Sequence, residues 1–280
     1  MGTRQGQWSL TGHHLAEANW LDVHFEAFRP EYEAMLRAIG LEPGWRVLDA
    51  GCGSGSFLPL LAELVGPTGH VTALDVSPDN LGRLDQRVAS GGFTCPVVTR
   101  AGTVTALPDP DHYFDAVWSA NVSQYLTDEE LTAALAESRR VVRPGGLVAF
   151  KEGAGEHMSW YPADPGLLRR LVEANRRMSV QAHGLLRARE LRRWLERAGL
   201  TAVWQRTTLV ERWAPLSPVE RTYVGDLVAF MTKTAAQLPL PDEDAAFWRA
   251  QGDPASSDFL ANHPELYWCQ GYVVAVGRVS

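Results

Sequence analysis

A short apolar run followed by three alternating glycines constrains the fold of this chain more than any other feature. Residues 47–55 read Val-Leu-Asp-Ala-Gly-Cys-Gly-Ser-Gly, and an apolar helical pattern follows. The order of strand, acid, glycine turn and helix is typical of α/β sheets that bind nucleotide-like ligands. We expect glycine here because a Cβ would block the approach of a ligand to the backbone. A second acid, Asp75, follows Gly55 by twenty residues, where a carboxylate can accept hydrogen bonds from both hydroxyls of a ribose.

The middle of the chain alternates short apolar runs with helical patterns, which predicts a parallel sheet with crossover helices. A capping box formed by Thr127 and Glu130 begins the clearest helix, and Ser77 is expected to cap a helix that starts at Pro78. The predicted strands are 45–49, 71–75, 96–100, 114–120, 147–151, 201–213 and 267–279. The predicted helices include 127–142 and 186–198.

Three stretches do not fit this alternation, namely 1–30, 153–184 and 214–264, and they are rich in Trp, Tyr, His and Pro. We interpret them as a lid and cap over the carboxyl edge of the sheet, where open α/β sheets bind ligands. The alternative is peripheral decoration. The predicted organisation is a single domain over residues 1–280. It has a lid at 1–30, a cofactor-binding core at 31–152 and a substrate-side half with cap insertions at 153–280.

Composition excludes several classes of partner. The net charge of −7 argues against a broad nucleic-acid or anionic-membrane surface, which needs clustered Lys and Arg. Three widely spaced cysteines without a CxxC motif indicate a reduced, cytoplasmic chain, and no apolar run is long enough for a membrane span. The eight histidines show no metal-ligand spacing, so no metal is expected. We expect a monomer or homodimer that acts on a small, neutral or cationic molecule.

The glycine turn resembles motif I of class I S-adenosylmethionine-dependent methyltransferases, and Asp75 resembles their second motif. A dinucleotide fingerprint would have Gly or Ala where this chain has Ser56, which disfavours a nicotinamide oxidoreductase. The resemblance spans residues 44–152 and is to the type 11, natural-product tailoring branch. It continues through 101–108, which is similar to the segment that cradles adenine. The remaining similarity lies in two segments. The first is Phe114-Asp115-Ala116-Val117 together with Asn121-Val122-Ser123, and the second is Arg143-Pro144-Gly145-Gly146.

This resemblance implies a Rossmann-like, seven-stranded, mostly parallel sheet with an antiparallel last strand, together with an N-terminal helical lid and cap insertions. It also implies S-adenosylmethionine as cofactor and S-adenosylhomocysteine as product. Thr103 stands where the family usually has Asp, so it would accept a bond from the adenine amine more weakly. Arg29 and Tyr32 either hold the cofactor's carboxylate or have a surface salt-bridge or capping role. The implied cofactor-binding residues are Arg29, Tyr32, Asp49, Gly51, Gly53, Gly55, Asp75, Val76, Thr103, Val104 and Asn121.

The implied reaction is methyl transfer to a small aromatic or heteroaromatic acceptor in secondary metabolism. The protein supplies orientation and water exclusion, and a base is needed only if the nucleophile must lose a proton. Glu152, His24 and His183 are the candidate catalytic residues, and His157 is a further candidate base. Glu152 is expected where the fifth strand leaves the sheet; the alternative is a salt bridge at the rim.

Two observations bear on the acceptor. Ten tryptophans favour a flat aromatic ligand, although an ordinary core role accounts for many of them. The region 119–123 lacks the proline pair of amino-methylating DNA enzymes and the Pro-Cys nucleophile of cytosine methylases. A cyclase or rearrangement enzyme on the same fold, without net methyl transfer, is the alternative function. The tryptophans in or beside the expected cap are Trp8, Trp20, Trp160, Trp213, Trp248 and Trp268.

Overall fold

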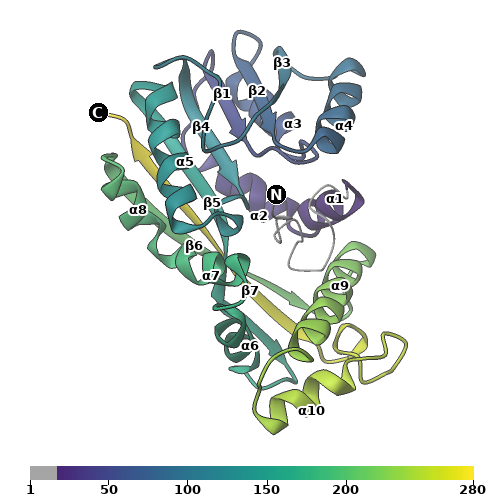
Figure 1. The fold of residues 1–280 in the computed structure, drawn as a ribbon. Helices are drawn as coiled ribbons and strands as arrows, with labels where there is room; N and C mark the ends of the chain where they lie inside the picture. The colour runs from purple at the N-terminus through teal and green to yellow at the C-terminus, as the bar shows by residue number, and fades with distance from the viewer. Residues whose placement is uncertain (1–17) are drawn as a thin grey trace.

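A computed structural model describes residues 18–280, and its centre is one seven-stranded sheet in the order β3-β2-β1-β4-β5-β7-β6 (Figure 1). The first five strands along the chain run parallel, whereas β7 lies antiparallel between β5 and β6. This arrangement confirms the predicted fold. The strands are β1 (Arg46–Ala50), β2 (His70–Asp75), β3 (Val97–Ala101), β4 (Phe114–Ala120), β5 (Val142–Tyr161), β6 (Thr201–Trp213) and β7 (Tyr267–Arg278).

Helices cover both faces of the sheet, and two of them begin at the capping residues that the sequence predicted. Thr127 and Glu130 form the predicted capping box, and the Ser77 hydroxyl accepts a bond from the Asn80 amide at 3.4 Å. The helices are α1 (Ala18–Ala27), α2 (Arg29–Arg37), α3 (Leu58–Val65), α4 (Pro78–Ala89), α5 (Asp128–Val141), α6 (Leu167–Asn175), α7 (Val180–Arg187), α8 (Leu191–Arg197), α9 (Pro218–Ala235) and α10 (Asp242–Ala250). Short 3₁₀ turns lie at η1 (Ser123–Tyr125), η2 (Ala188–Glu190) and η3 (Leu260–Asn262).

Side chains alternate across the strands, so the sheet separates two apolar clusters. Trp118 and Ala149 pack on one face with α2 and α3, and Val117 and Val148 pack on the other with α5 and α8. These strands are buried on both faces, which explains their continuous apolar runs. The predicted helix 186–198 is wrong in its extent, because the chain divides there into the end of α7, a 3₁₀ turn and α8.

The fifth strand is far longer than predicted. It has 20 residues, and its pairing with β7 continues from Leu147 to Tyr161, with one irregularity between Ala154 and Met158. The prediction that the strand leaves the sheet at Glu152 is therefore wrong, because Glu152 pairs with Val273 inside it. Glycines and polar residues after Glu152 end the apolar run without ending the strand, since β7 supplies the hydrogen bonds. The expected boundary at residue 152 falls within this strand.

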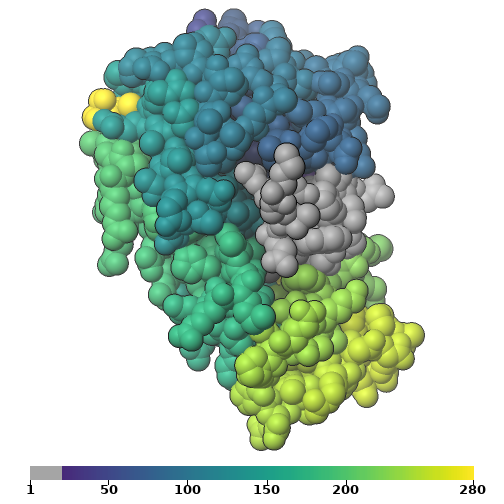
Figure 2. All heavy atoms as spheres, viewed as in Figure 1, coloured from purple at the N-terminus to yellow at the C-terminus, as the bar shows by residue number. Residues whose placement is uncertain are grey.

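Helices α6, α9 and α10 lie around the extended ends of β5, β6 and β7 (Figure 1). On the face drawn in Figure 2, α9 and α10 form the part of the molecule opposite the strands and helices of residues 46–120. The stretches 153–184 and 214–264 contain α6, α9 and α10 and the extended end of β5. Residues 1–17 of the expected lid, with Trp8, lie outside the described residues, and so does the side chain of Trp20.

The other tryptophans of the expected cap divide into two groups. Trp160, Trp248 and Trp268 are buried core residues, and the rings of Trp160 and Trp248 meet edge to face at 6.1 Å. Trp213 is exposed and contacts Tyr267. In the part of the chain that the structure describes, no helix is both long and apolar enough to cross a bilayer.

Candidate active site

The glycine turn after β1 folds back against β2. The amides of Gly51 and Cys52 both donate to the carbonyl of Leu74, at 2.8 and 3.0 Å. Gly51, Gly53 and Gly55 have φ values of 80°, 55° and 77°, in the left-handed region that favours glycine. The three glycines are therefore required by backbone conformation.

The packing of the protein itself gives a further steric reason for these glycines. A Cβ at Gly51 would lie 2.4 Å from Val122 Cγ2, and one at Gly53 would lie 3.1 Å from Leu21 Cδ1. At Gly55 it would lie 2.4 Å from Leu84 Cδ2. The neighbours are side chains of this protein, so the glycines permit close packing of the turn against α1, α4 and the loop after β4.

The two acids of the motif lie beside this turn. Asp75 is buried and accepts bonds from the Gly53 amide at 2.9 Å, the Ser77 amide at 2.8 Å and Asn80 Nδ2 at 3.2 Å. Asp49 is buried with no partner for its Oδ2, and burial, helped by the charge of Asp75, raises its pKa to about 8. The adjacent Val76 is 67% exposed, so an apolar surface lies open next to the acids.

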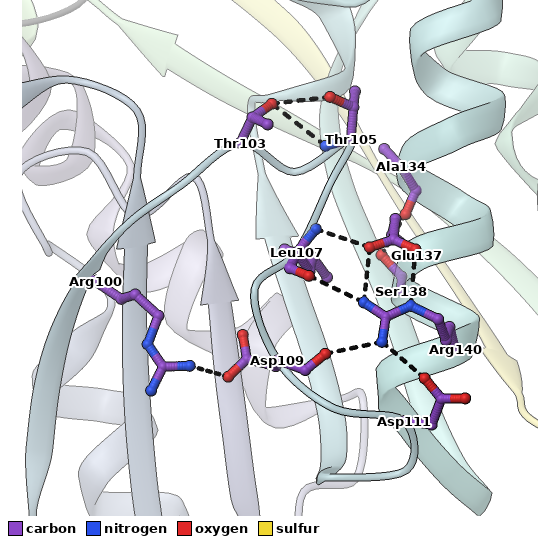
Figure 3. A network of polar contacts seen from close by, with 10 residues as sticks. All are labelled: Arg100, Thr103, Thr105, Leu107, Asp109, Asp111, Ala134, Glu137, Ser138 and Arg140. Carbon is purple, nitrogen blue, oxygen red and sulfur yellow. Dashed lines mark hydrogen bonds and ion pairs between the residues drawn. The ribbon is translucent and has the colours of Figure 1, made fainter.

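The segment that follows β3 is fixed by α5 (Figure 3). Glu137 accepts a bond from the Leu107 amide at 2.8 Å and also holds the guanidinium of Arg140. Thr103 is exposed, and its hydroxyl lies 2.9 Å from that of Thr105. The segment is thus held against α5. Val104 is half-buried, and the Thr103 hydroxyl already has Thr105 as a partner. The acceptors of Arg140 on this segment are Leu107 O, Asp109 O and Asp111 Oδ1.

Asn121 follows β4 directly and adopts a left-handed conformation with φ of 58°. Its amide donates to the Lys151 carbonyl at 2.7 Å, and Lys151 Nζ donates to its Oδ1 at 2.8 Å. Lys151 is completely buried, with Nζ 3.5 Å from the ring centroid of Tyr32 and 4.2 Å from that of Tyr272. A buried amine and the loop after β4 are therefore joined at the edge of the sheet.

His24 and Tyr32 come together over this point. Tyr32 is buried, and its hydroxyl lies 2.9 Å from His24 Nε2. The His24 ring stacks on Tyr223 of α9 at 5.2 Å. Burial, and secondarily Lys151, hold the pKa of His24 well below its usual value. His24 is thus neutral at neutral pH, and its Nε2 is engaged by Tyr32.

Glu152 points to the opposite face of β5 and is also completely buried. Its Oε1 accepts a bond from the Ser123 amide at 2.7 Å, whereas its Oε2 has no partner. Burial raises the pKa of Glu152 to about 7, although Ser123, Lys151 and Arg187 oppose the shift. The rim salt bridge does not form, because Arg187 binds the carbonyls of Ser123 and Leu126 together with Asp128.

The remaining candidates lie elsewhere. Arg29 is half-exposed and pairs with Glu26 and Glu33, in agreement with the surface salt-bridge alternative. His183 of α7 is 44% exposed, with its Nε2 3.2 Å from Asp128 Oδ1. His157 lies beside Glu156 at 3.5 Å. The structure brings none of these three into the Lys151–Tyr32 group, and residues 18–280 contain no metal-binding cluster.

Sequence reasoning missed several polar residues of this site. The Tyr223 hydroxyl donates to Gln270 Oε1 at 3.2 Å, and Gln181 Nε2 donates to the Tyr125 hydroxyl at 3.0 Å. Burial, followed by the charge of Glu152, raises the pKa of Tyr125. The sequence signal available for this site was the presence of Gln270 and Tyr272 inside the otherwise apolar last strand. The residues missed are Ser123, Tyr125, Lys151, Gln181, Tyr223, Gln270 and Tyr272.

Comparisons with known proteins agree with this geometry. Residues 47–146 match the family described as methyltransferase domain. The chain is 39% identical over 117 residues to the ubiquinone/menaquinone biosynthesis C-methyltransferase UbiE of Cupriavidus taiwanensis, which covers 42% of this chain and 46% of that protein. It is 31% identical over 140 residues to the demethylmenaquinone methyltransferase of Bacillus subtilis, covering 49% and 57%. The chain thus spans about half the length of these curated relatives.

Solved structures show the same fold. A SAM-dependent methyltransferase from Aquifex aeolicus aligns with a TM-score of 0.53 and 20% identity, over 94% of this chain and 98% of that one. Phosphoethanolamine N-methyltransferase 2 of Haemonchus contortus, in complex with phosphomonomethylethanolamine and S-adenosylhomocysteine, aligns with a TM-score of 0.56 and 13% identity, over 94% and 58%. Residues 47–146 therefore match the expected methyltransferase domain, and the solved structures confirm its fold.

The packing around Gly55 generates a stability prediction. Gly55→Ala should cost roughly 1–2 kcal/mol for its left-handed φ and a further 1–3 kcal/mol for overpacking against Leu84 and Leu58. Gly91 has a φ of 75°, and no atom lies within 4 Å of the point that its Cβ would occupy, so Gly91→Ala should show the first cost alone. Urea unfolding of both variants measures the difference. Equal losses would contradict the packing role.

The burial of Glu152 generates a prediction about pH. Because its folded pKa is raised from 4.5 to about 7, the folded state binds more protons than the unfolded state between these values. The unfolding free energy of the natural protein should therefore fall relative to Glu152→Gln as pH rises through this window, by on the order of 3 kcal/mol. Denaturant unfolding across pH measures this difference. Glu265→Gln, at an exposed position, is the control, and parallel curves for Glu152→Gln would contradict the assignment.

Proposed function

We propose that this chain, whose residues 47–146 form a class I methyltransferase domain, transfers a methyl group from S-adenosylmethionine to a small aromatic or heteroaromatic acceptor. The observation that carries the proposal is the placement of Asp75 and Asp49 beside a glycine turn in the left-handed conformation, next to the exposed Val76. This combination matches the needs of an adenosine group, namely acceptors for ribose hydroxyls and an apolar surface for a flat ring.

The residues present fit the cofactor. A carboxylate has about four lone-pair sites, so Asp75 can accept a bond from one ribose hydroxyl in addition to its three protein donors. The unpartnered Oδ2 of Asp49 offers a further acceptor near the turn. Val76 would support one face of adenine, and Thr103 and Val104 would border it. S-adenosylmethionine supplies an activated methyl group when bound, so the protein contributes mainly orientation and exclusion of water.

The acceptor is proposed to bind beside the end of β4 and the middle of β5, at Lys151 and Glu152. Aromatic rings from α1, α2, α9 and β7 surround this region, and flat side chains favour flat ligands. Glu152 is proposed to take part in a hydrogen bond with the acceptor through its unpartnered Oε2. His24 is proposed to hold the Tyr32 hydroxyl in position. His183 lies against Asp128, so we give it no chemical step.

The names of the relatives give the proposal further support. Several are described as C-methyltransferases of ubiquinone and menaquinone biosynthesis, and quinols are aromatic acceptors. Our proposal for this chain extends to an aromatic acceptor of secondary metabolism, as the resemblance implies. Product mass tests the transfer, because a methylated product gains one CH₂ whereas a cyclised or rearranged product keeps the mass of its precursor.

The cofactor assignment predicts a defined loss of affinity. Asp75→Asn keeps the shape of the side chain but removes its charge, and it should weaken S-adenosylhomocysteine binding by roughly 1.5–3 kcal/mol, the cost of charged hydrogen bonds. Titration calorimetry measures the affinity, and circular dichroism checks the fold. Asp79→Asn is the matched control, because Asp79 is an exposed acid on the first turn of α4. Equal affinities of the two variants would remove Asp75 from the ribose site.

A further inference from the structure

Lys151 lies at the edge where a methyl group would be delivered. It pairs with Ala120, the last residue of β4, and with Val274 of β7. Its amine and carbonyl both bind Asn121, the first residue of the loop after β4. Ligands of open α/β sheets bind at the carboxyl ends of the strands. Lys151 thus belongs to the same edge as the glycine turn, although β5 continues beyond it.

The amine lies among an amide oxygen and two aromatic rings. Its side chain is completely buried, and Asn121 Oδ1 accepts its hydrogen bond at 2.8 Å. The faces of Tyr32 and Tyr272 lie 3.5 and 4.2 Å from Nζ. Among residues 18–280, no carboxylate forms an ion pair with it. Glu152, the next residue, points across the strand to the Ser123 amide.

The titratable side chains that pack around Lys151 from other elements are uncharged at neutral pH. His24 comes from α1, Tyr32 from α2, Tyr223 from α9 and Tyr272 from β7. Burial raises the pKa of all three tyrosines, so they are neutral hydroxyls at neutral pH. Burial lowers the pKa of Lys151 well below its usual value, and the charge of Glu152 only partly opposes this shift. Burial therefore favours the neutral amine, whose nitrogen carries a lone pair.

We propose that Lys151 is a catalytic residue that takes the proton of an acidic hydroxyl group, a phenol or an enol, on the acceptor. This inference rests on the proposed function. The O–H bond of the acceptor breaks, and the proton joins the lone pair of Nζ. The freed electron pair of the acceptor, at oxygen or at the conjugated carbon, forms the bond to the methyl carbon. The carbon–sulfur bond breaks with its electron pair left on sulfur.

The surroundings of Lys151 suit this change of charge. Asn121 Oδ1 and the two tyrosine faces stabilise the ammonium once it forms. Tyr32 and His24, from α2 and α1, cover the amine, so the acceptor reaches it when this cover moves. The proton then leaves to water as the product departs. The rival role is purely structural, namely a tie that keeps Asn121 in its left-handed conformation.

The first test measures the protonation of Lys151 directly. The sequence contains only two lysines, Lys151 and Lys233, so protein labelled with ¹³C at lysine Cε gives two signals. Lys233→Arg assigns them, because Lys233 is exposed on α9. We expect the Lys151 signal to titrate well below that of Lys233 in the free natural protein. A Lys151 signal that titrates together with that of Lys233 overturns the proposal, whatever the cofactor affinity.

The second test separates a base from a structural tie. 4-Nitrophenol is added with S-adenosylhomocysteine at a pH at which the free probe is mostly protonated, and the visible phenolate band is recorded. We expect a phenolate band with the natural protein and with Lys233→Met, and its loss with Lys151→Met. Calorimetry with S-adenosylhomocysteine shows whether each variant keeps its cofactor site, so failure of the proposed function is recognised separately. An equal band with Lys151→Met overturns the proposal, and the lysine titration decides if that variant does not fold.

Discussion

Asp49, Asp75, Lys151 and Glu152 are all buried at neighbouring positions along one edge of the sheet, and each must lose most of its hydration. Transfer of an ionised side chain out of water costs several kcal/mol unless hydrogen bonds or opposite charges compensate. Three hydrogen-bond donors surround the carboxylate of Asp75. Burial raises the pKa of Asp49 and Glu152 and lowers that of Lys151, which favours the neutral form of each. The loops and helices at this edge are arranged so that they reduce the free-energy cost of burying these four groups.

Much of the surrounding structure serves these buried groups. The loop after β4 turns through the left-handed Asn121 so that it faces Lys151 and places the Ser123 amide against Glu152. Arg187 then binds the carbonyls of the same loop and fixes it from the opposite side. The loop is therefore held between two strands and α7, which keeps polar groups close to one another in a region that water does not reach.

The sequence predicted the half of the fold whose signals are local. Six of the seven predicted strands, the capping box at Thr127 and the glycine turn were placed within one residue of their observed positions. The length of β5 was missed, because its continuation past Glu152 depends on pairing with β7, more than a hundred residues away. Long-range pairing overrides local pattern there.

The candidate site divides in the same way. Asp75 lies where its spacing indicated, since the distance between motif residues is fixed by one strand–helix–strand unit. Lys151 was passed over because a lysine next to a glutamate in sequence suggests a solvated strand end. The alternation of side chains across a strand places the two residues on opposite faces, with Lys151 beside Tyr32 and Tyr272. Burial of this kind becomes visible only when the covering helices are in place.

The contact of α1 with the glycine turn has a thermodynamic consequence. Leu21 packs toward Gly53, and Asp22 accepts bonds from the hydroxyls of Ser54 and Ser56 at 2.9 and 3.1 Å. A ligand that occupies the space over this turn exchanges these contacts for its own, so its measured affinity is the difference between the two sets. A change that weakens only these contacts of Leu21 and Asp22 would therefore tighten the binding of such a ligand, by raising the fraction of molecules that are ready to receive it.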